Sequence, residues 1–290
     1  MRGSQMLPYR DNRLILPEGG DRALMQVTAG VVALRKAPAP DATQVSQALF
    51  GETVILHHEE GEFGLVQCIQ DGYVGWALME ALSAPVLKAT HRVTAPRLHV
   101  YSEPSITSAA SFVIGVGAQL TATGERDGRY LRFERAGWIV DHLVAPADQL
   151  ETDPAEVAQR CLSTPYLWGG RDCLGWDCSG LVQIVFGACG VAAPRDSDMQ
   201  RDWFGDSIEE WEKPGTLQRN DLIFWKGHVG ILIDAETLLH ANGTFMTTMK
   251  EPLRPAIERI ATEYGEPLGA RRIDVTKLRG VQPPWLTLQV

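Results

Sequence analysis

The residue best placed for covalent chemistry is Cys178, in the stretch GWDCSGLVQIVFGACG at 175–190. Apolar residues after it recur at spacings of three and four, which predicts one buried face of a helix beginning at about Ser179. Because a helix N-terminus carries partial positive charge, we expect it to lower the pKa of the Cys178 thiol and favour the nucleophilic thiolate. The free N–H groups there could also stabilise a tetrahedral oxyanion. The apolar positions are Leu181, Ile184, Val185 and Ala188.

A thiol nucleophile needs a general base, and two histidines downstream are candidates. The stretch LIFWKGHVGILIDAETLLHANG, residues 222–243, predicts an antiparallel hairpin with His228 opening one strand and His240 near the end of the other. Because a hairpin returns the chain to its starting edge, both imidazoles could lie on one face. One could serve Cys178 as base while the other fixes its tautomer. Taken alone, each histidine could equally be structural.

A zinc site made from Cys173, Cys178, His228 and His240 is an alternative use of the same residues. Four residues separate the two cysteines, at the long edge of the usual range. Eleven residues separate the two histidines, against about three to five in finger-type sites. The spacing therefore disfavours zinc, and we expect neither a metal nor another cofactor.

The first half of the chain contains an internal repeat, in which Trp76 and Trp138 mark equivalent positions 62 residues apart. Short alternating runs between Gly, Pro, Asp and Asn residues predict two small all-β barrels. Each tryptophan is more readily a half-buried core residue than part of an aromatic binding face. The first copy has VVALRKAP, ALFGETVIL and DGYVGWALMEAL, and the second has RLHVYSEP, VIGVGAQLTAT and RAGWIVDHL.

A change in composition after the second copy predicts a third domain. Thr152, Asp153 and Pro154 read as a helix start, with a capping residue followed by proline at the first helical position. The expected divisions are an N-terminal extension at 1–22, barrels at 23–85 and 86–148, and a larger domain at 149–290.

Composition narrows the possible partners. The chain of 290 residues is 44% hydrophobic and 22% charged, as in soluble globular proteins, and its net charge of −9 disfavours nucleic acid. The start MRGSQMLPYRDNRLIL lacks the apolar core of a signal peptide, and no stretch reaches the roughly 18 apolar residues of a membrane helix. We therefore expect a cytoplasmic protein without a membrane partner. Five cysteines, an odd number, indicate reduced thiols rather than a disulfide framework.

Two families resemble parts of this sequence. The stretch GYVGWALMEAL is similar to bacterial SH3 (SH3b) domains, and the second copy matches more weakly. The motifs PYLWGG, DCSGL, PRDSDMQ, GHVGI and LHANG, in this order within about 152–275, resemble NlpC/P60 cysteine peptidases. This resemblance implies a multidomain chain, with two SH3b-like barrels before an α+β papain-like domain. It assigns Cys178 as nucleophile, His228 as general base and His240 as orienting residue.

The domain order is similar to that of γ-D-glutamyl-L-diamino acid endopeptidases. The resemblance implies cleavage after γ-D-Glu in murein peptides that carry a free N-terminal L-Ala, in cell-wall recycling. In such enzymes the first SH3b domain shortens the cleft with an aromatic and an acidic residue. Tyr73 is the matching aromatic residue, and Asp41 is the candidate acidic residue.

The resemblance also implies four substrate-binding residues around the nucleophile. Asp177 is matched to an anionic partner of the substrate ammonium, and Ser179 and Ser197 to hydroxyls of the same subsite. Tyr166 is matched to a tyrosine near the thiol that contacts the oxyanion or the substrate. Structural roles stay open, because Asp177 could support the first helical turn and Ser179 could be its N-cap.

Two further functions stay open. One is a different reaction on the same fold, such as an amidase or a cysteine-dependent acyltransferase. The other is a non-catalytic module that binds cell wall through its SH3b units.

Overall fold

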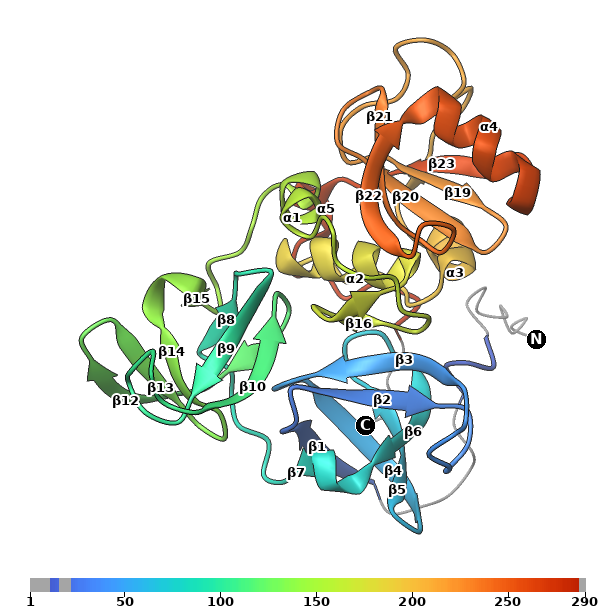
Figure 1. Cartoon of the computed structure of the whole chain (residues 1–290). Coiled ribbons are helices and arrows are strands. Elements are labelled where there is room, and N and C mark those ends of the chain that lie inside the picture. The colour runs from blue at the N-terminus through green and yellow to red at the C-terminus, as the bar shows by residue number, and fades with distance from the viewer. Residues whose placement is uncertain (1–10, 16–21, 287–290) are drawn as a thin grey trace, which may run out of the picture.

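The computed structural model describes residues 11–15 and 22–286 and is mostly β, with a few helices (Figure 1). We name three parts: the first β part (β1–β7), the second β part (β8–β15) and the C-terminal part (α1–α5 with β16–β23). Most of the expected N-terminal extension at 1–22 lies outside the described residues. No helix within the described ranges is long and apolar enough to cross a membrane.

The first β part is a seven-stranded antiparallel sheet in the order β3-β2-β6-β5-β4-β1-β7. Alternating residues such as Val32 and Leu34 point into its apolar core, and Trp76 of β6 pairs with Arg35 of β2. Its elements are β1 Ala23–Val27, β2 Val31–Arg35, β3 Gln44–Leu49, β4 Thr53–Glu60, β5 Phe63–Cys68, β6 Val74–Leu78, the 3-10 helix η1 Met79–Ala81 and β7 Leu82–Ser83.

The second β part repeats this strand order in two sheets, β10-β9-β14-β13-β12 and β11-β8-β15. Trp138 of β14 pairs with Tyr101 of β9, as Trp76 pairs with Arg35, and both tryptophans are half-buried. The predicted repeat is therefore confirmed as a repeat of strand order. The elements are β8 His91–Val93, β9 Arg97–Tyr101, β10 Ala110–Gly115, β11 Gln119–Leu120, β12 Ala122–Asp127, β13 Tyr130–Phe133, β14 Gly137–Val140, η2 Asp141–Leu143 and β15 Val144–Pro146.

The C-terminal part is built on a six-stranded antiparallel sheet in the order β18-β23-β19-β20-β21-β22. Its central strands are buried on both faces. Leu222 and Phe224 of β19 share an apolar cluster with α2, whereas Ile223 and Trp225 share another with α4. The sheet strands are β18 Asp206–Ser207, β19 Leu222–Trp225, β20 His228–Leu232, β21 Thr237–Asn242, β22 Thr247–Pro252 and β23 Gly269–Arg272, and a separate hairpin joins β16 Arg171–Asp172 to β17 Gly175–Trp176.

The helices of the C-terminal part follow the predicted start signals. Asp153 caps α1 by accepting a hydrogen bond from the Ala155 backbone amide, and Pro154 occupies the first helical position. Cys178 is the first residue of α2, and His228 and His240 lie on paired strands, so the predicted helix and hairpin are confirmed. The helices are α1 Pro154–Arg160, α2 Cys178–Ala188, α3 Ser197–Trp203, α4 Leu253–Tyr264 and α5 Val275–Leu278.

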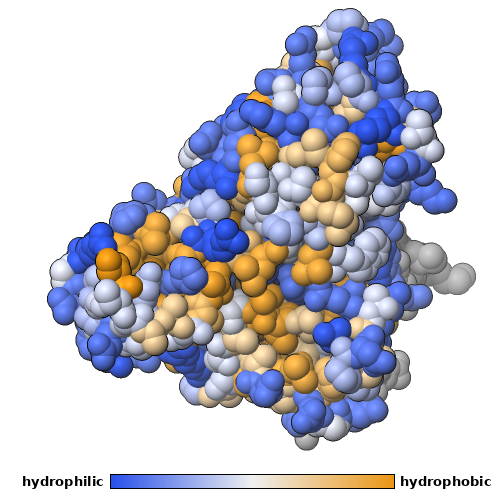
Figure 2. Space-filling view, in the orientation of Figure 1, coloured by the Kyte–Doolittle hydropathy of each residue, from blue (hydrophilic) through white to orange (hydrophobic). Residues whose placement is uncertain are grey.

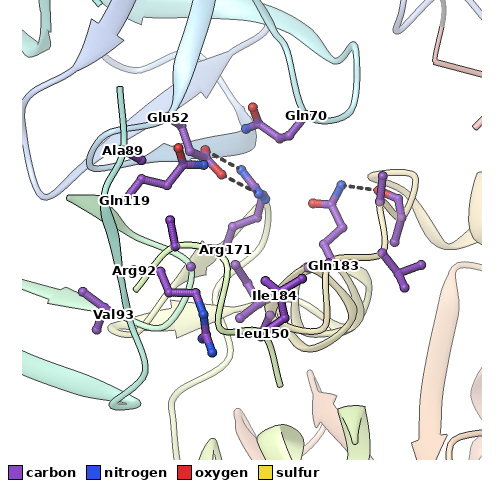
Figure 3. Close-up of a pocket in the computed structure, with 18 of the residues that line it drawn as sticks. Glu52, Gln70, Ala89, Arg92, Val93, Gln119, Leu150, Arg171, Gln183 and Ile184 are labelled. Carbon is purple, nitrogen blue, oxygen red and sulfur yellow. Dashed lines mark hydrogen bonds and ion pairs between the residues drawn. The ribbon is translucent and has the colours of Figure 1, made fainter. Parts of the chain in front are cut away.

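The three parts meet around α2, where Figure 2 shows hydrophobic residues gathered on the visible face. Leu49 of the first β part and Val116 of the second belong to the same apolar cluster as α2. A cavity of about 400 Å³ lies at this junction, and Arg171 pairs there with Glu52 at 3.0 Å (Figure 3). Apolar burial and one buried ion pair therefore hold the first β part against the C-terminal part.

Cys173, a candidate ligand of the alternative zinc site, lies where the second β part meets the C-terminal part. A Cβ atom on Gly115 of β10 would lie 2.5 Å from the Cβ of Cys173, so this close approach requires glycine. Burial raises the pKa of the Cys173 thiol. Cys173 therefore packs as a small apolar residue between the two parts.

Candidate active site

The N-terminus of α2 holds Cys178 against the first residues of β20. Asp177 is the N-cap, and its Oδ1 accepts a hydrogen bond from the Gly180 amide at 2.7 Å. Ser179 lies inside the helix, so its alternative role as N-cap is wrong. The Cys178 Sγ lies 3.9 Å from the Gly227 carbonyl oxygen and accepts a hydrogen bond from the Val229 amide. The sulfur therefore contacts the backbone on both sides of His228.

The protonation state of the thiol differs from the sequence-based prediction. Burial, with a smaller contribution from the Asp177 carboxylate, raises the pKa of Cys178 to about 12. Burial also lowers the pKa of His228 to about 3, with His240 and Arg259 acting in the same direction. This direction is opposite to the expected low thiol pKa, because desolvation disfavours the thiolate. Both shifts favour a neutral thiol and a neutral imidazole in the substrate-free site.

The two histidines form one hydrogen-bonded pair. His228 Nε2 lies 2.8 Å from His240 Nδ1, and this bond leaves Nδ1 as the unengaged ring nitrogen of His228. Tyr264 of α4 stacks on the His228 ring with the centroids 5.8 Å apart, which restrains its orientation. The predicted hairpin thus brings both imidazoles to one face.

The hydrogen-bond chain continues to two residues that the sequence analysis missed. His240 Nε2 lies 2.8 Å from Glu251 Oε1, and Glu251 forms an ion pair with Arg259 of α4. Bonds from His240 and Arg259 lower the pKa of Glu251, so this carboxylate is ionised at neutral pH. Antiparallel pairing of β21 with β22 sets Glu251 beside His240. Glu251 could have been found from the sequence by expecting a further strand directly after the hairpin, paired with the strand that carries His240.

A cavity of about 820 Å³ opens above Cys178, between the first β part and the C-terminal part. The structure brings all five predicted substrate-binding residues to it, whereas Asp41 is exposed and lies outside the cavity lining. We call this cavity the cleft. The predicted residues that line it are Tyr73, Tyr166, Asp177, Ser179 and Ser197.

Two of these residues are engaged in internal hydrogen bonds. Arg195 binds both oxygens of Asp177, at 3.0 and 2.7 Å, and also donates to the Ser179 hydroxyl at 3.0 Å. Asp177 accepts two further bonds from the amides of Gly169 and Gly180. Its carboxylate is therefore saturated, and the geometry favours a bracing role for Asp177 over contact with a substrate ammonium.

Asp196 lines the cleft and forms a hydrogen bond with a residue of the first β part. The Tyr73 hydroxyl donates to Asp196 Oδ2 at 3.0 Å, and Arg13 forms an ion pair with the same oxygen at 2.7 Å. Asp196 Oδ1 lies 3.9 Å from Arg195, beyond hydrogen-bond distance. Arg195 therefore pairs chiefly with Asp177, at 2.7 Å. The sequence analysis did not single out Asp196 as a functional residue.

The remaining predicted residues supply neutral groups. Burial, followed by the effect of Cys178, raises the pKa of Tyr166, so its phenol stays protonated and can donate a hydrogen bond. Ser197 is the first residue of α3 and is 9% exposed. Both residues line the cleft beside Cys178.

The zinc alternative needs its four ligands in one cluster. Among the described residues, no three His, Cys, Asp or Glu side chains form a group that could hold a metal ion. Cys173 instead packs against Gly115, away from the His228–His240 pair. The arrangement of these side chains therefore gives the zinc site no support.

Comparison with known proteins agrees with this arrangement. Residues 163–259 match the NlpC/P60 family, and residues 34–82 match the SH3 domain of bacterial dipeptidyl-peptidases. Dipeptidyl-peptidase 6 of Lysinibacillus sphaericus is 29% identical over 173 residues, which cover 58% of this chain and 59% of that protein. Gamma-D-glutamyl-L-lysine dipeptidyl-peptidase of Bacillus subtilis is 27% identical over 233 residues, covering 69% of this chain and 72% of the relative.

The fold also matches a solved structure. The crystal structure of an NlpC/P60 family protein from Bacillus cereus superposes with a TM-score of 0.72, at 22% identity, over 86% of this chain and 99% of that one. This likeness concerns the fold alone. The chain therefore carries a bacterial SH3 domain, matched at 34–82, followed by an NlpC/P60 domain, matched at 163–259.

Proposed function

We propose that this protein is a cysteine peptidase that hydrolyses the bond between γ-D-Glu and a diamino acid in murein peptides with a free N-terminal L-Ala. The observation that carries the proposal is the position of Cys178, which lines the cleft and whose sulfur lies 3.9 Å from the carbonyl oxygen of Gly227, the residue before His228. Two relatives named gamma-D-glutamyl-L-lysine dipeptidyl-peptidases support the choice of bond.

The proposed reaction begins from the neutral thiol. As the Cys178 sulfur attacks the γ-carbonyl carbon of D-Glu, its proton passes to His228 Nδ1, the nitrogen that His240 leaves unengaged. Tyr166 and the backbone N–H groups at the start of α2 are candidate donors to the oxyanion. The imidazolium then protonates the amine of the departing diamino acid. Water, deprotonated by His228, hydrolyses the thioester and releases the L-Ala-D-Glu dipeptide.

The first β part supports a preference for short peptides. Tyr73 enters the cleft from this part and donates a hydrogen bond to Asp196. Asp196 Oδ1 is a candidate partner for the N-terminal ammonium of L-Ala, since the Asp177 carboxylate is already saturated. A requirement for this free amine would suit recycling of wall peptides that have already been released.

The proposal extends to the domain organisation. We propose that residues 86–148 form a second SH3b-like barrel, because the strand order of β8–β15 repeats that of β1–β7. We also propose a papain-like arrangement of the C-terminal part. Its support is the packing of α2, which begins with Cys178, against the sheet that carries His228 and His240.

The test is mass spectrometry of the products formed from L-Ala-γ-D-Glu-L-Lys and from its diaminopimelate analogue. Wild-type protein should release L-Ala-D-Glu and the free diamino acid. Cys178→Ala should lower kcat at least about 1000-fold, because it removes the sulfur on which the acyl intermediate forms. Cys173→Ser is the matched control and should keep wild-type kcat, since Cys173 lies outside the cleft.

Each failure has a separate meaning. Undiminished hydrolysis by Cys178→Ala would refute the cysteine mechanism. Equal rates on the free and N-acetylated tripeptides would refute amine recognition while leaving the thiol chemistry intact. Release of a different product, such as free L-Ala from hydrolysis of the other amide bond or a transpeptidation product, would favour the amidase or acyltransferase alternative.

A further inference from the structure

Glu251 ends a hydrogen-bond chain that runs from His228 through His240. Its Oε1 lies 2.8 Å from His240 Nε2, and His240 Nδ1 lies 2.8 Å from His228 Nε2. The His240 side chain is fully buried and that of Glu251 is 15% exposed. Arg259 pairs with the same carboxylate and sits 5.1 Å from the centre of the Phe245 ring. Glu251 is therefore held in place from two sides.

The charge of Glu251 fixes where the hydrogen on His240 must lie. An ionised carboxylate only accepts hydrogen bonds, so His240 Nε2 must carry the hydrogen in their shared bond. Asn242 Nδ2 also lies 3.3 Å from this nitrogen and, as a donor, would favour the opposite arrangement. The bond to Glu251 is shorter and charge-assisted, so it decides the tautomer.

The same constraint passes to the next ring. A neutral imidazole carries one hydrogen, so His240 Nδ1 has a lone pair and accepts from His228 Nε2–H. His228 Nδ1 is then the basic nitrogen. The geometry points to Glu251 as a positioning residue that selects one tautomer of both histidines and leaves His228 Nδ1 free to accept the Cys178 proton. This inference rests on the proposed thiol chemistry.

Without the carboxylate, the two linked rings gain access to a second arrangement, which the Asn242 amide favours. In the second arrangement His240 Nδ1 donates to His228 Nε2, which places the hydrogen of His228 on Nδ1 and blocks proton transfer from Cys178. Arg259 and Glu251 affect the pKa of His228 in opposite directions, so their charges partly offset at that ring. Placement of the hydrogen is therefore the main contribution of Glu251.

The experiment compares Glu251→Gln with Arg259→Gln in the full chain. Both substitutions remove the ion pair, but only Glu251→Gln removes the obligate acceptor, because a glutamine amide can also donate. Glu251→Gln should lower kcat about 10- to 100-fold, with KM unchanged because Glu251 lies outside the cleft lining. Arg259→Gln should keep kcat within about threefold. Glu258→Gln, exposed on α4, is the control for a charge change on this face.

A second readout follows the rings directly. Nitrogen-15 NMR spectra of histidine-labelled protein, recorded also in a Cys178→Ala background, should show His228 protonated at Nε2 in wild type and Arg259→Gln. Glu251→Gln should show a mixture. A wild-type spectrum with the hydrogen on His228 Nδ1, or an unchanged spectrum in Glu251→Gln, would overturn the inference. So would equal kcat losses in both variants. If no peptide is cleaved, the proposed function fails, while the spectra still decide the hydrogen positions.

Discussion

The two β parts share a strand order and differ in what they contact. The first β part lines the cleft with Tyr73 and Trp76 and is joined to the C-terminal part by the buried Glu52–Arg171 pair. The second β part contacts the C-terminal part on the side away from the cleft, where Gly115 approaches Cys173. Shared topology therefore does not imply a shared role.

One pair of equivalent positions shows how the difference arises. Tyr73 and Arg135 each lie three residues before the tryptophan of their copy. Tyr73 donates to Asp196 in the cleft, whereas Arg135 donates to Gln26 and to the Pro85 carbonyl of the first β part. The same loop therefore supplies a cleft residue in one copy and an inter-domain contact in the other.

The largest expected effect is a difference in stability between two variants, one that breaks the buried Glu52–Arg171 pair of the first β part and one that breaks an exposed pair of the second. Arg171→Ala leaves the Glu52 carboxylate buried and unpaired, which should lower the free energy of unfolding by about 3–5 kcal/mol. The matched control is Arg132→Ala, which removes an exposed pair with Glu125 and should cost about 0–1 kcal/mol. Urea unfolding of both variants checks this, and equal losses would contradict the assigned role of the Glu52–Arg171 pair.

The next largest effect is a difference in alkylation rate between Cys178, which lines the cleft beside the first β part, and Cys173, which lies against the second β part. Because the pKa of Cys178 is raised to about 12, its thiolate fraction should rise about tenfold per pH unit from pH 6 to 9. Alkylation of Cys178 by iodoacetamide in substrate-free protein should follow this slope. Cys173, enclosed under the second β part, should react far more slowly at each pH.

Peptide mass spectrometry distinguishes the two cysteines in the same sample. A rate for Cys178 that stays constant down to pH 5 would show a resting thiolate–imidazolium pair. That result would contradict the neutral state assigned to Cys178 and His228.

The smallest expected effect tests the equivalent loop positions. Tyr73→Phe removes a hydrogen bond to a charged acceptor, so KM for L-Ala-γ-D-Glu-L-Lys should rise about tenfold with kcat little changed. Arg135→Ala should leave KM within about twofold, because Arg135 donates to Gln26 and Pro85 and is not among the residues that line the cleft. Steady-state kinetics measure both. A similar rise in the two variants would show that cleft shape, rather than the Tyr73 hydroxyl, controls binding.

The sequence by itself determined the local elements that carry the site. Apolar spacing places Cys178 at a helix start, and alternation around a turn places His228 and His240 on paired strands. The repeat of Trp76 and Trp138 indicates the repeated strand order. These features depend on neighbours within a few residues, or on self-similarity, and so can be read along the chain.

Tertiary structure alone decided the direction of the pKa shift of Cys178 and which side chains pair with the carboxylates at the cleft. Burial raises the pKa of Cys178 against the effect of its helix, and Arg195 saturates Asp177, which leaves Asp196 as the available carboxylate. Tyr73 reaches that carboxylate across 123 residues of chain. Desolvation and ion pairing depend on atoms brought together by folding from distant segments, and local sequence patterns carry no information about such encounters.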